Sequence, residues 1–137
     1  MKTDKITKED ILAMCYLLGK IQGREIETHL RQKDYVVTDY DNYIKFFKNN
    51  QIDKNKWVDP YRVCLHFAYK MLDVANDWLN GVALFYAEFD KPGSTYLHDA
   101  NAFIDISKRY IWFVEPQTDY TFSSADLKGN KVIWVQK

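Results

Sequence analysis

Three residues whose types suit nucleophilic chemistry stand well apart in this chain of 137 residues: Cys64, His98 and Glu115. A cysteine thiolate is a strong nucleophile, an imidazole can hold it as an ion pair, and a carboxylate can fix the orientation of the imidazole. The three residues form one site only if the elements that carry them converge in the fold.

Cys64 lies near the start of the clearest predicted helix, which covers residues 59 to 79. Asp59 is a suitable N-cap, and Pro60 suits the first helical position. The partial positive charge at the N-terminal end of a helix favours a thiolate, so a cysteine placed there can be activated. The alternative is that Cys64 is a small core residue, because it shares an apolar face with Leu72.

His98 lies in a predicted strand, residues 95 to 106, in which alternate residues point to the same face. Ala100 and Ala102 share the face of His98 and leave room for a helix to approach. We therefore expect His98 to face the helix that carries Cys64. The alternative is a core histidine that hydrogen-bonds a backbone carbonyl.

Glu115 ends another predicted strand, residues 109 to 115, on the face of Ile111 and Phe113. A carboxylate aligned with two apolar residues needs a partner. His98 in the adjacent strand would supply one. The alternative is a carboxylate at the end of the strand that turns out to solvent.

The rest of the chain is predicted to be helical before residue 57 and strand-forming after Gly81. A first helix follows a Thr7 N-cap, and a second, smaller helix follows Asp39 or Asp41. The first 56 residues are thus predicted to be a helical N-terminal extension.

Two further strands, residues 82 to 89 and 132 to 136, are bounded by turn signals. Together with the strands that carry His98 and Glu115, they predict an antiparallel sheet of about four strands. Helices followed by such strands indicate an α+β fold, with the central helix packed on the sheet in one compact domain.

The composition is that of a packed globular chain, since 47% of the residues are hydrophobic and 16% are aromatic. Nineteen basic residues balance nineteen acidic ones, so no net charge attracts nucleic acid. The sequence has neither a signal-type apolar region at its start nor an apolar run of membrane-spanning length. We expect a soluble, cytoplasmic protein without nucleic-acid or membrane partners.

No metal and no cofactor is predicted. The three histidines, His29, His66 and His98, show no metal-ligand spacing, and no glycine-rich loop could hold a phosphate. The two cysteines do not make a disulfide framework for a domain of this size.

Three segments of the sequence resemble motifs of the transglutaminase-like branch of the papain-like cysteine protease fold, over roughly residues 57 to 120. "YRVCLHFAYKML" is similar to the segment around that family's nucleophile, "HDANAF" keeps the histidine and Asn101 of its second motif, and "YIWFVEPQT" is similar to its third. The resemblance implies that Cys64 is the nucleophile, His98 the base and Glu115 the third member of a triad.

The same resemblance implies a papain-like or transglutaminase-like core over residues 57 to 137. The sequence departs from the family pattern where Ala100 replaces a tryptophan and where Glu115 stands for an aspartate. The backbone N–H of Cys64 is a candidate oxyanion donor, with a side chain such as Gln117 or Trp57 as the second. The predicted binding residues are Trp57, Tyr61, Asn101 and Gln117.

The activity implied by the resemblance is acyl transfer, in which Cys64 attacks an amide or ester carbonyl and His98 returns the proton to the leaving group. The substrate would be a peptide, a protein or a small molecule, with water or an amine as acceptor. One alternative is a catalytically inactive binding module, in which aromatic residues line a pocket for a sugar, a nucleotide or a peptide. Those aromatic residues are Trp57, Tyr61, Tyr96, Trp112 and Tyr120. A third reading is an interaction protein that holds a protein partner through the N-terminal helices.

Overall fold

The computed structural model describes residues 1–50 and 63–137, and within them eleven helices and strands. Their bounds are β1 Thr3–Thr7, α1 Lys8–Gln22, β2 Glu27–His29, β3 Asp34–Thr38, α2 Tyr40–Asn49, α3 Val63–Trp78, β4 Leu84–Asp90, β5 Leu97–Phe103, β6 Trp112–Val114, β7 Thr121–Ser123 and β8 Lys131–Gln136.

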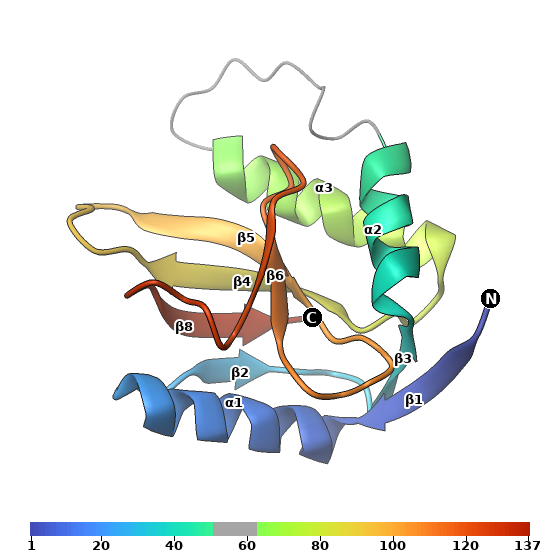
Figure 1. Cartoon of the computed structure of the whole chain (residues 1–137), viewed down its shortest axis with the longest axis horizontal. Coiled ribbons are helices and arrows are strands. Elements are labelled where there is room, and N and C mark those ends of the chain that lie inside the picture. The colour runs from blue at the N-terminus through green and yellow to red at the C-terminus, as the bar shows by residue number, and fades with distance from the viewer. Residues whose placement is uncertain (51–62) are drawn as a thin grey trace.

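The main sheet has six strands in the order β2-β8-β4-β5-β6-β7. β2 runs parallel to β8, and every other neighbouring pair is antiparallel, so the sheet is mixed. β1 and β3 form a separate antiparallel pair. In Figure 1, α3 lies over one face of the main sheet and α1 lies on the opposite side.

The first helix begins and ends as its sequence predicts. The Oγ1 atom of Thr7 accepts a hydrogen bond from the backbone N–H of Asp10 at 3.1 Å, which confirms the predicted N-cap. Gly23 follows the helix with a φ of 74°, a left-handed conformation that glycine adopts without strain.

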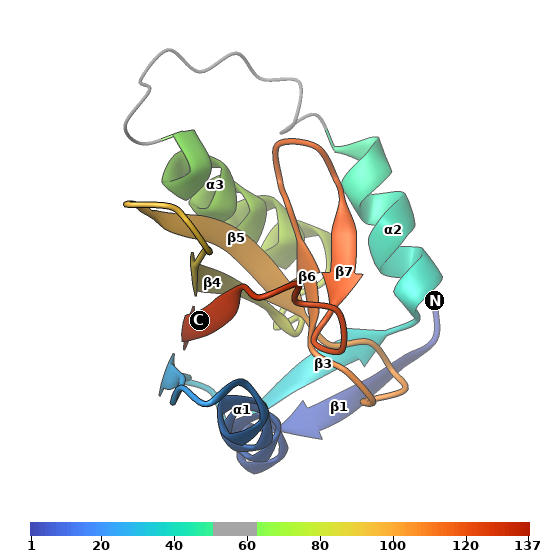
Figure 2. The same ribbon diagram turned by 60° about the vertical axis from the view of Figure 1, so that its left-hand side comes forward.

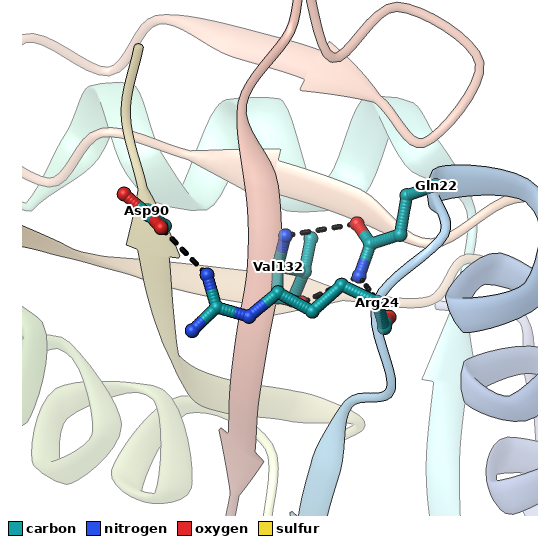
Figure 3. Close-up of polar contacts among 4 residues, drawn as sticks. All are labelled: Gln22, Arg24, Asp90 and Val132. Carbon is teal, nitrogen blue, oxygen red and sulfur yellow. Dashed lines mark hydrogen bonds and ion pairs between the residues drawn. The ribbon is translucent and has the colours of Figure 1, made fainter. Parts of the chain in front are cut away.

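A clamp between α1 and the sheet holds the segment that leads into β2 (Figure 3). The side-chain amide of Gln22 accepts from the backbone N–H of Val132 at 3.0 Å and donates to the carbonyl of the same residue at 2.6 Å. Arg24 Nη1 lies 2.6 Å from Asp90 Oδ2. The N-terminal part of the chain is thereby fixed to β8 and β4.

Two buried clusters lie on the two faces of the sheet. One joins α1 to the sheet and contains Ile11, Phe85 and Phe113. The other lies under α2 and α3 and contains Met71 and Phe103 among others. Figure 2 shows β7 beside α2, where the hydroxyl oxygens of Tyr40 and Thr121 are 2.9 Å apart.

The face of β5 that packs against α3 differs from the sequence prediction. Asp99, Asn101 and Phe103 face α3, whereas Ala100 and Ala102 belong to the cluster on the α1 side. The reason is cross-strand packing, because Ala102 lies between two phenylalanines of its neighbouring strands. The small side chains make room for aromatic rings within the sheet and not for the helix.

The predicted fold class is wrong in two respects. The sheet has six strands with a parallel pair, where about four antiparallel strands were predicted. The N-terminal segment is not a helical extension, because it holds β1, β2 and β3, and β2 is an edge strand of the main sheet. The predicted boundary between residues 56 and 57 lies outside the described residues.

Within residues 1–50 and 63–137, no helix has both the length and the apolar character required to cross a bilayer. The same part of the chain contains no group of three or more His, Cys, Asp or Glu side chains placed to hold a metal ion.

Candidate functional site

An imidazole and a carboxylate meet at the end of β5. His98 Nε2 is hydrogen-bonded to Glu115 Oε1, and each side chain is 21% exposed. Glu115 directly follows β6 and is held by a tight turn, in which its carbonyl accepts from the backbone N–H groups of Thr118 and Asp119. The turn fixes the carboxylate where the imidazole can reach it.

The surroundings of His98 favour its charged form. Hydrogen bonds to Cys64 and then to Glu115 raise the pKa of His98 to about 9, although burial and the positive charge of Lys91 act against this. The imidazole is therefore an imidazolium at neutral pH, paired with the Glu115 carboxylate.

Cys64 lies in the first turn of α3 and reaches two consecutive residues of β5. Its Sγ atom donates a hydrogen bond to Asp99 Oδ2 at 3.3 Å, and it is also hydrogen-bonded to His98. His98 Nε2 is occupied by Glu115, so Nδ1 is the ring nitrogen that remains for the thiol. The structure thus brings Cys64, His98 and Glu115 together. This holds even though His98 stands at an even position of β5, whereas Asp99, Asn101 and Phe103, which face α3, stand at odd positions.

A network of polar groups that sequence analysis missed extends behind the thiol. The hydroxyl of Tyr86 hydrogen-bonds Asp99 Oδ1 and lies 2.9 Å from Glu88 Oε2. Burial, followed by these two carboxylates, raises the pKa of Tyr86 far above its usual range, so the phenol stays protonated. The ring of Tyr69 stacks on that of Tyr86, with centroids 5.1 Å apart.

A signal for this network exists in the sequence only once the strand register is known. Glu88 and Asp99 are directly opposite each other in the β4–β5 ladder, and Tyr86 is two residues from Glu88 on the same face. The two strands are recognisable from their composition, but their pairing is not.

A hollow of about 300 Å³ opens beside the His98–Glu115 pair. Its walls combine aromatic rings with polar and charged side chains. They are formed by Phe89, Lys91, His98, Glu115, Gln117, Thr118, Tyr120, Phe122 and Asn130. Cys64 is not among these lining residues, and His98 connects the thiol with the hollow.

The predicted binding residues lie in different surroundings. Gln117 lines the hollow. Asn101 is fully buried, where its amide donates to the carbonyls of Ala68 at 3.0 Å and Phe85 at 3.1 Å, and thus ties α3 to β4. Trp57 and Tyr61 lie outside the described residues.

Of the described aromatic candidates, Tyr120 alone lines the hollow. Tyr96 is 77% exposed, and the ring of Trp112 packs against Tyr40 with centroids 4.6 Å apart. The predicted aromatic pocket is therefore not assembled from these residues as a group.

A larger hollow, of about 540 Å³, lies between α1 and β2 and includes Cys15. Burial raises the pKa of that thiol to about 12, so it stays protonated and unreactive at neutral pH. Arg24 in the wall of this larger hollow forms a nearly half-exposed ion pair with Asp90, whereas the His98–Glu115 pair beside the smaller hollow is mostly buried. The hollow beside His98 is therefore the stronger candidate for specific binding.

Comparisons with known proteins find similar solved structures but no family. No family model matches the chain, and no curated protein matches it. A structure of PSL1a in complex with E64 matches with a TM-score of 0.76 and 17% identity, over 97% of this chain and 51% of that one. Polyporus squamosus lectin, bound to the human-type influenza-binding epitope Neu5Acα2-6Galβ1-4GlcNAc, matches with a TM-score of 0.75 and 18% identity, over 97% of this chain and 49% of that one.

These matches correct the predicted family and function. The chain shares its fold with about half of each of these two chains, and no family model, transglutaminase-like or other, matches it. The prediction of a transglutaminase-like or papain-like hydrolase, with acyl transfer as its activity, is therefore wrong. The alternative prediction, a binding module, agrees better with these matches.

Proposed function

We propose that this chain is a ligand-binding module and that the ligand occupies the hollow beside His98 and Glu115. The observation that carries the proposal is an imidazolium–carboxylate pair, four-fifths buried, set in the wall of a hollow of about 300 Å³. Binding sites combine such a concave shape with a few fixed polar groups that orient the ligand.

The lining residues favour a small polar ligand with an apolar face. Tyr120 and Phe122 offer aromatic rings, and the amide of Gln117 can both donate and accept hydrogen bonds. His98 and Lys91 place two positive charges near a single carboxylate, that of Glu115. An acidic sugar or another small carboxylate fits this balance of charge.

The ligands named for the matched structures supply two probes, E64 and the sialylated trisaccharide. Each matched protein is about twice as long as the region that this chain covers, so both ligands are candidates for binding to this chain. Cys64, His98 and Glu115 remain the proposed reactive centre of the site, with Gln117 in contact with the ligand. Trp57 and Tyr61 remain predictions as further binding residues.

The test is an NMR titration of the chain with each probe, with Galβ1-4GlcNAc as the neutral ligand that lacks the sialic acid and hence its carboxylate. We expect shifts at His98, Gln117 and Tyr120 with a carboxylate-bearing probe and weaker shifts with the neutral disaccharide. Binding of neither probe, or shifts confined to other surfaces, would overturn the proposal.

A matched pair of variants locates the site. Glu115→Gln removes the buried partner of His98, and Glu27→Gln removes the exposed partner of His29, whose Nε2 lies 3.4 Å from Glu27 Oε1. We expect Glu115→Gln to weaken binding at least about tenfold, since a buried ionic partner is lost, and Glu27→Gln to leave it unchanged. The reverse result would place the ligand on β2 and β8 and refute the proposed site.

A further inference from the structure

We propose that the hollow beside His98 binds its ligand in one orientation, with the ligand's carboxylate on Lys91 at one end and a less polar part on Tyr120 at the other. The ligand is then an elongated molecule with an acidic group at one end, such as an acidic oligosaccharide. This inference deepens the proposed function and rests on it, because it assigns the two ends of the same site.

The hollow lies across the ends of neighbouring strands of the main sheet. Lys91 directly follows β4, His98 lies near the start of β5, Glu115 directly follows β6 and Tyr120 directly precedes β7. Antiparallel pairing brings these ends to one edge of the sheet, in the order β4-β5-β6-β7. Neighbouring strands lie about 4.8 Å apart, so about 14 Å separates the backbones of β4 and β7. A ligand that touches both ends must therefore be elongated.

The His98–Glu115 pair in the middle of the hollow already has its partners within the protein. His98 Nε2 is hydrogen-bonded to Glu115, and the ring is also hydrogen-bonded to Cys64. Both ring nitrogens are thus occupied, and the Glu115 carboxylate balances the charge of the imidazolium. A ligand carboxylate placed here would be repelled by Glu115 and would find no donor on the ring. The acidic group of the ligand therefore lies elsewhere in the hollow.

Lys91 is the cation that remains for the ligand. Its ammonium group has three donors, and among the described residues no carboxylate forms an ion pair with it. The carboxylate of the preceding residue, Asp90, is taken by Arg24, whose Nη1 lies 2.6 Å from Oδ2. The positive charge of Lys91 also acts against that of His98. A ligand carboxylate on Lys91 would offset this repulsion between two cations.

The turn that carries Lys91 is held against the turn before β8. Within the first turn, the backbone N–H of Ser94 donates to the carbonyl of Lys91 at 3.2 Å. Pro92 approaches Gly129 so closely that a Cβ atom at Gly129 would lie 3.2 Å from Pro92 Cγ. Asn130, the residue after Gly129, lines the same hollow. This end of the hollow is therefore a packed part of the molecule that combines an ammonium group with an amide.

The opposite end of the hollow is aromatic. The rings of Tyr120 and Phe122 are stacked with centroids 5.8 Å apart, and Phe122 packs in turn on Phe113 and Phe89. Tyr120 is 52% exposed, so its ring remains available to a ligand. An aromatic ring has a negative face, which accepts an apolar group or the C–H face of a sugar and disfavours a carboxylate. The two ends therefore select different parts of one ligand.

The test compares the sialylated trisaccharide with its methyl ester, in which the carboxylate has lost its charge. NMR titration measures the binding of both to the parent chain and to Lys91→Met. We expect Lys91→Met to weaken binding of the trisaccharide at least about fivefold, because a charged hydrogen bond is lost. Binding of the ester should be unchanged.

Two further lysine variants control for the loss of charge. Lys131→Met removes the same charge from an exposed residue of β8 that does not line the hollow, and it should leave binding of both ligands unchanged. Lys91→Arg keeps the charge and should keep the preference for the acid over the ester. Circular dichroism checks that each variant is folded.

A tyrosine variant tests the other end. We expect Tyr120→Ala to weaken binding of the acid and of the ester by the same factor, about threefold or more, because the ring contacts the part that both ligands share. Tyr96→Ala is the matched control, since Tyr96 is also exposed and does not line the hollow.

The possible failures are distinct. If Lys91→Met leaves binding of the trisaccharide unchanged, or weakens the acid and the ester equally, the role of Lys91 is refuted and the site stands. If Tyr120→Ala abolishes the preference for the acid over the ester, the carboxylate lies at the other end and the orientation is refuted. If the parent chain binds neither the trisaccharide nor E64, the proposed function is refuted and the orientation with it.

Discussion

His98 and Glu115 make contact where the backbone pairing between their strands has ended. β5 and β6 are paired from Phe103 to Asn101, and both residues lie beyond the last pair, Asn101 with Val114. Beyond the last backbone pair, their side-chain hydrogen bond therefore joins β5 to the turn after β6. The hollow lies at this junction, so its shape depends on that bond.

The stability of the chain should depend on pH through His98. Its pKa in the folded chain, about 9, exceeds the ordinary value of 6.5, so its stabilising contribution is complete below pH 6.5 and is lost as pH rises through 9. The shift corresponds to roughly 3 kcal/mol at most. Urea unfolding of the parent chain and of His98→Gln should show a difference in free energy that shrinks between pH 6.5 and 9.

Lys137 should change the stability in the opposite direction over an overlapping range of pH. Burial lowers its pKa to about 8, so the cost of its charge in the folded state disappears between pH 8 and about 10.5. Both chains contain Lys137, so its effect cancels in the difference between them. A difference that stays constant from pH 6 to 10 would contradict the role given to His98.

The two cysteines should differ in reactivity in the folded chain. Cys15 is 2% exposed and burial raises its pKa to about 12, whereas Cys64 is partly exposed. Peptide mapping by mass spectrometry after brief alkylation at pH 8 should find label on Cys64 and almost none on Cys15. Both should react in 6 M guanidinium. Preferential labelling of Cys15 would show that this thiol is not buried in the cluster between α1 and the sheet.

Asn101 should be more important for stability than a typical surface asparagine. It is fully buried and bridges the carbonyls of Ala68 and Phe85. We expect Asn101→Ala to lower the free energy of unfolding by about 2 to 3 kcal/mol, because two buried acceptors lose a donor. Asn101→Asp should cost more, since a carboxylate would face two carbonyls.

Chemical denaturation measures both effects, and Asn130→Ala is a control in a surface turn, where the side chain bonds the carbonyl of Leu127. Equal, small losses in the Asn101 and Asn130 variants would contradict the bridging role.

The clamp at the end of α1 should derive its stability from Gln22 more than from Arg24. The Gln22 amide makes two hydrogen bonds to the buried residue Val132, whereas the Arg24–Asp90 pair is nearly half exposed. We expect Gln22→Ala to cost about 1 to 2 kcal/mol and Arg24→Ala less than about 1 kcal/mol. Differential scanning calorimetry compares the two, and a larger effect of Arg24→Ala would reverse this ranking.

Local signals in the sequence predicted individual elements well. The Thr7 N-cap of α1, the strand that carries His98 and the strand that Glu115 directly follows all depend on neighbouring residues, which are what a sequence pattern reports. The pairing of β2 with β8 joins segments from opposite ends of the chain, and β2 has three residues. No local pattern indicates such a pair, so the mixed sheet was missed.

The site was predictable to a similar degree. Residue type and strand parity pointed to His98 and Glu115 as partners, and the structure places them in contact. The face of β5 that meets α3 was misjudged, because Ala100 and Ala102 accommodate phenylalanine rings of adjacent strands. Asp99 was missed for the same reason, since its part in the site depends on the register of β4 and β5.

The double hydrogen bond between Gln22 and Val132 also bears on how molecules of this protein meet one another. β2 pairs with β8 from Trp134 to Gln136, so at Val132 the amide of Gln22 occupies the backbone groups that a further strand would use. A foreign strand cannot add to the sheet there without displacing that side chain. Gln22 thus blocks strand addition to β8 at Val132.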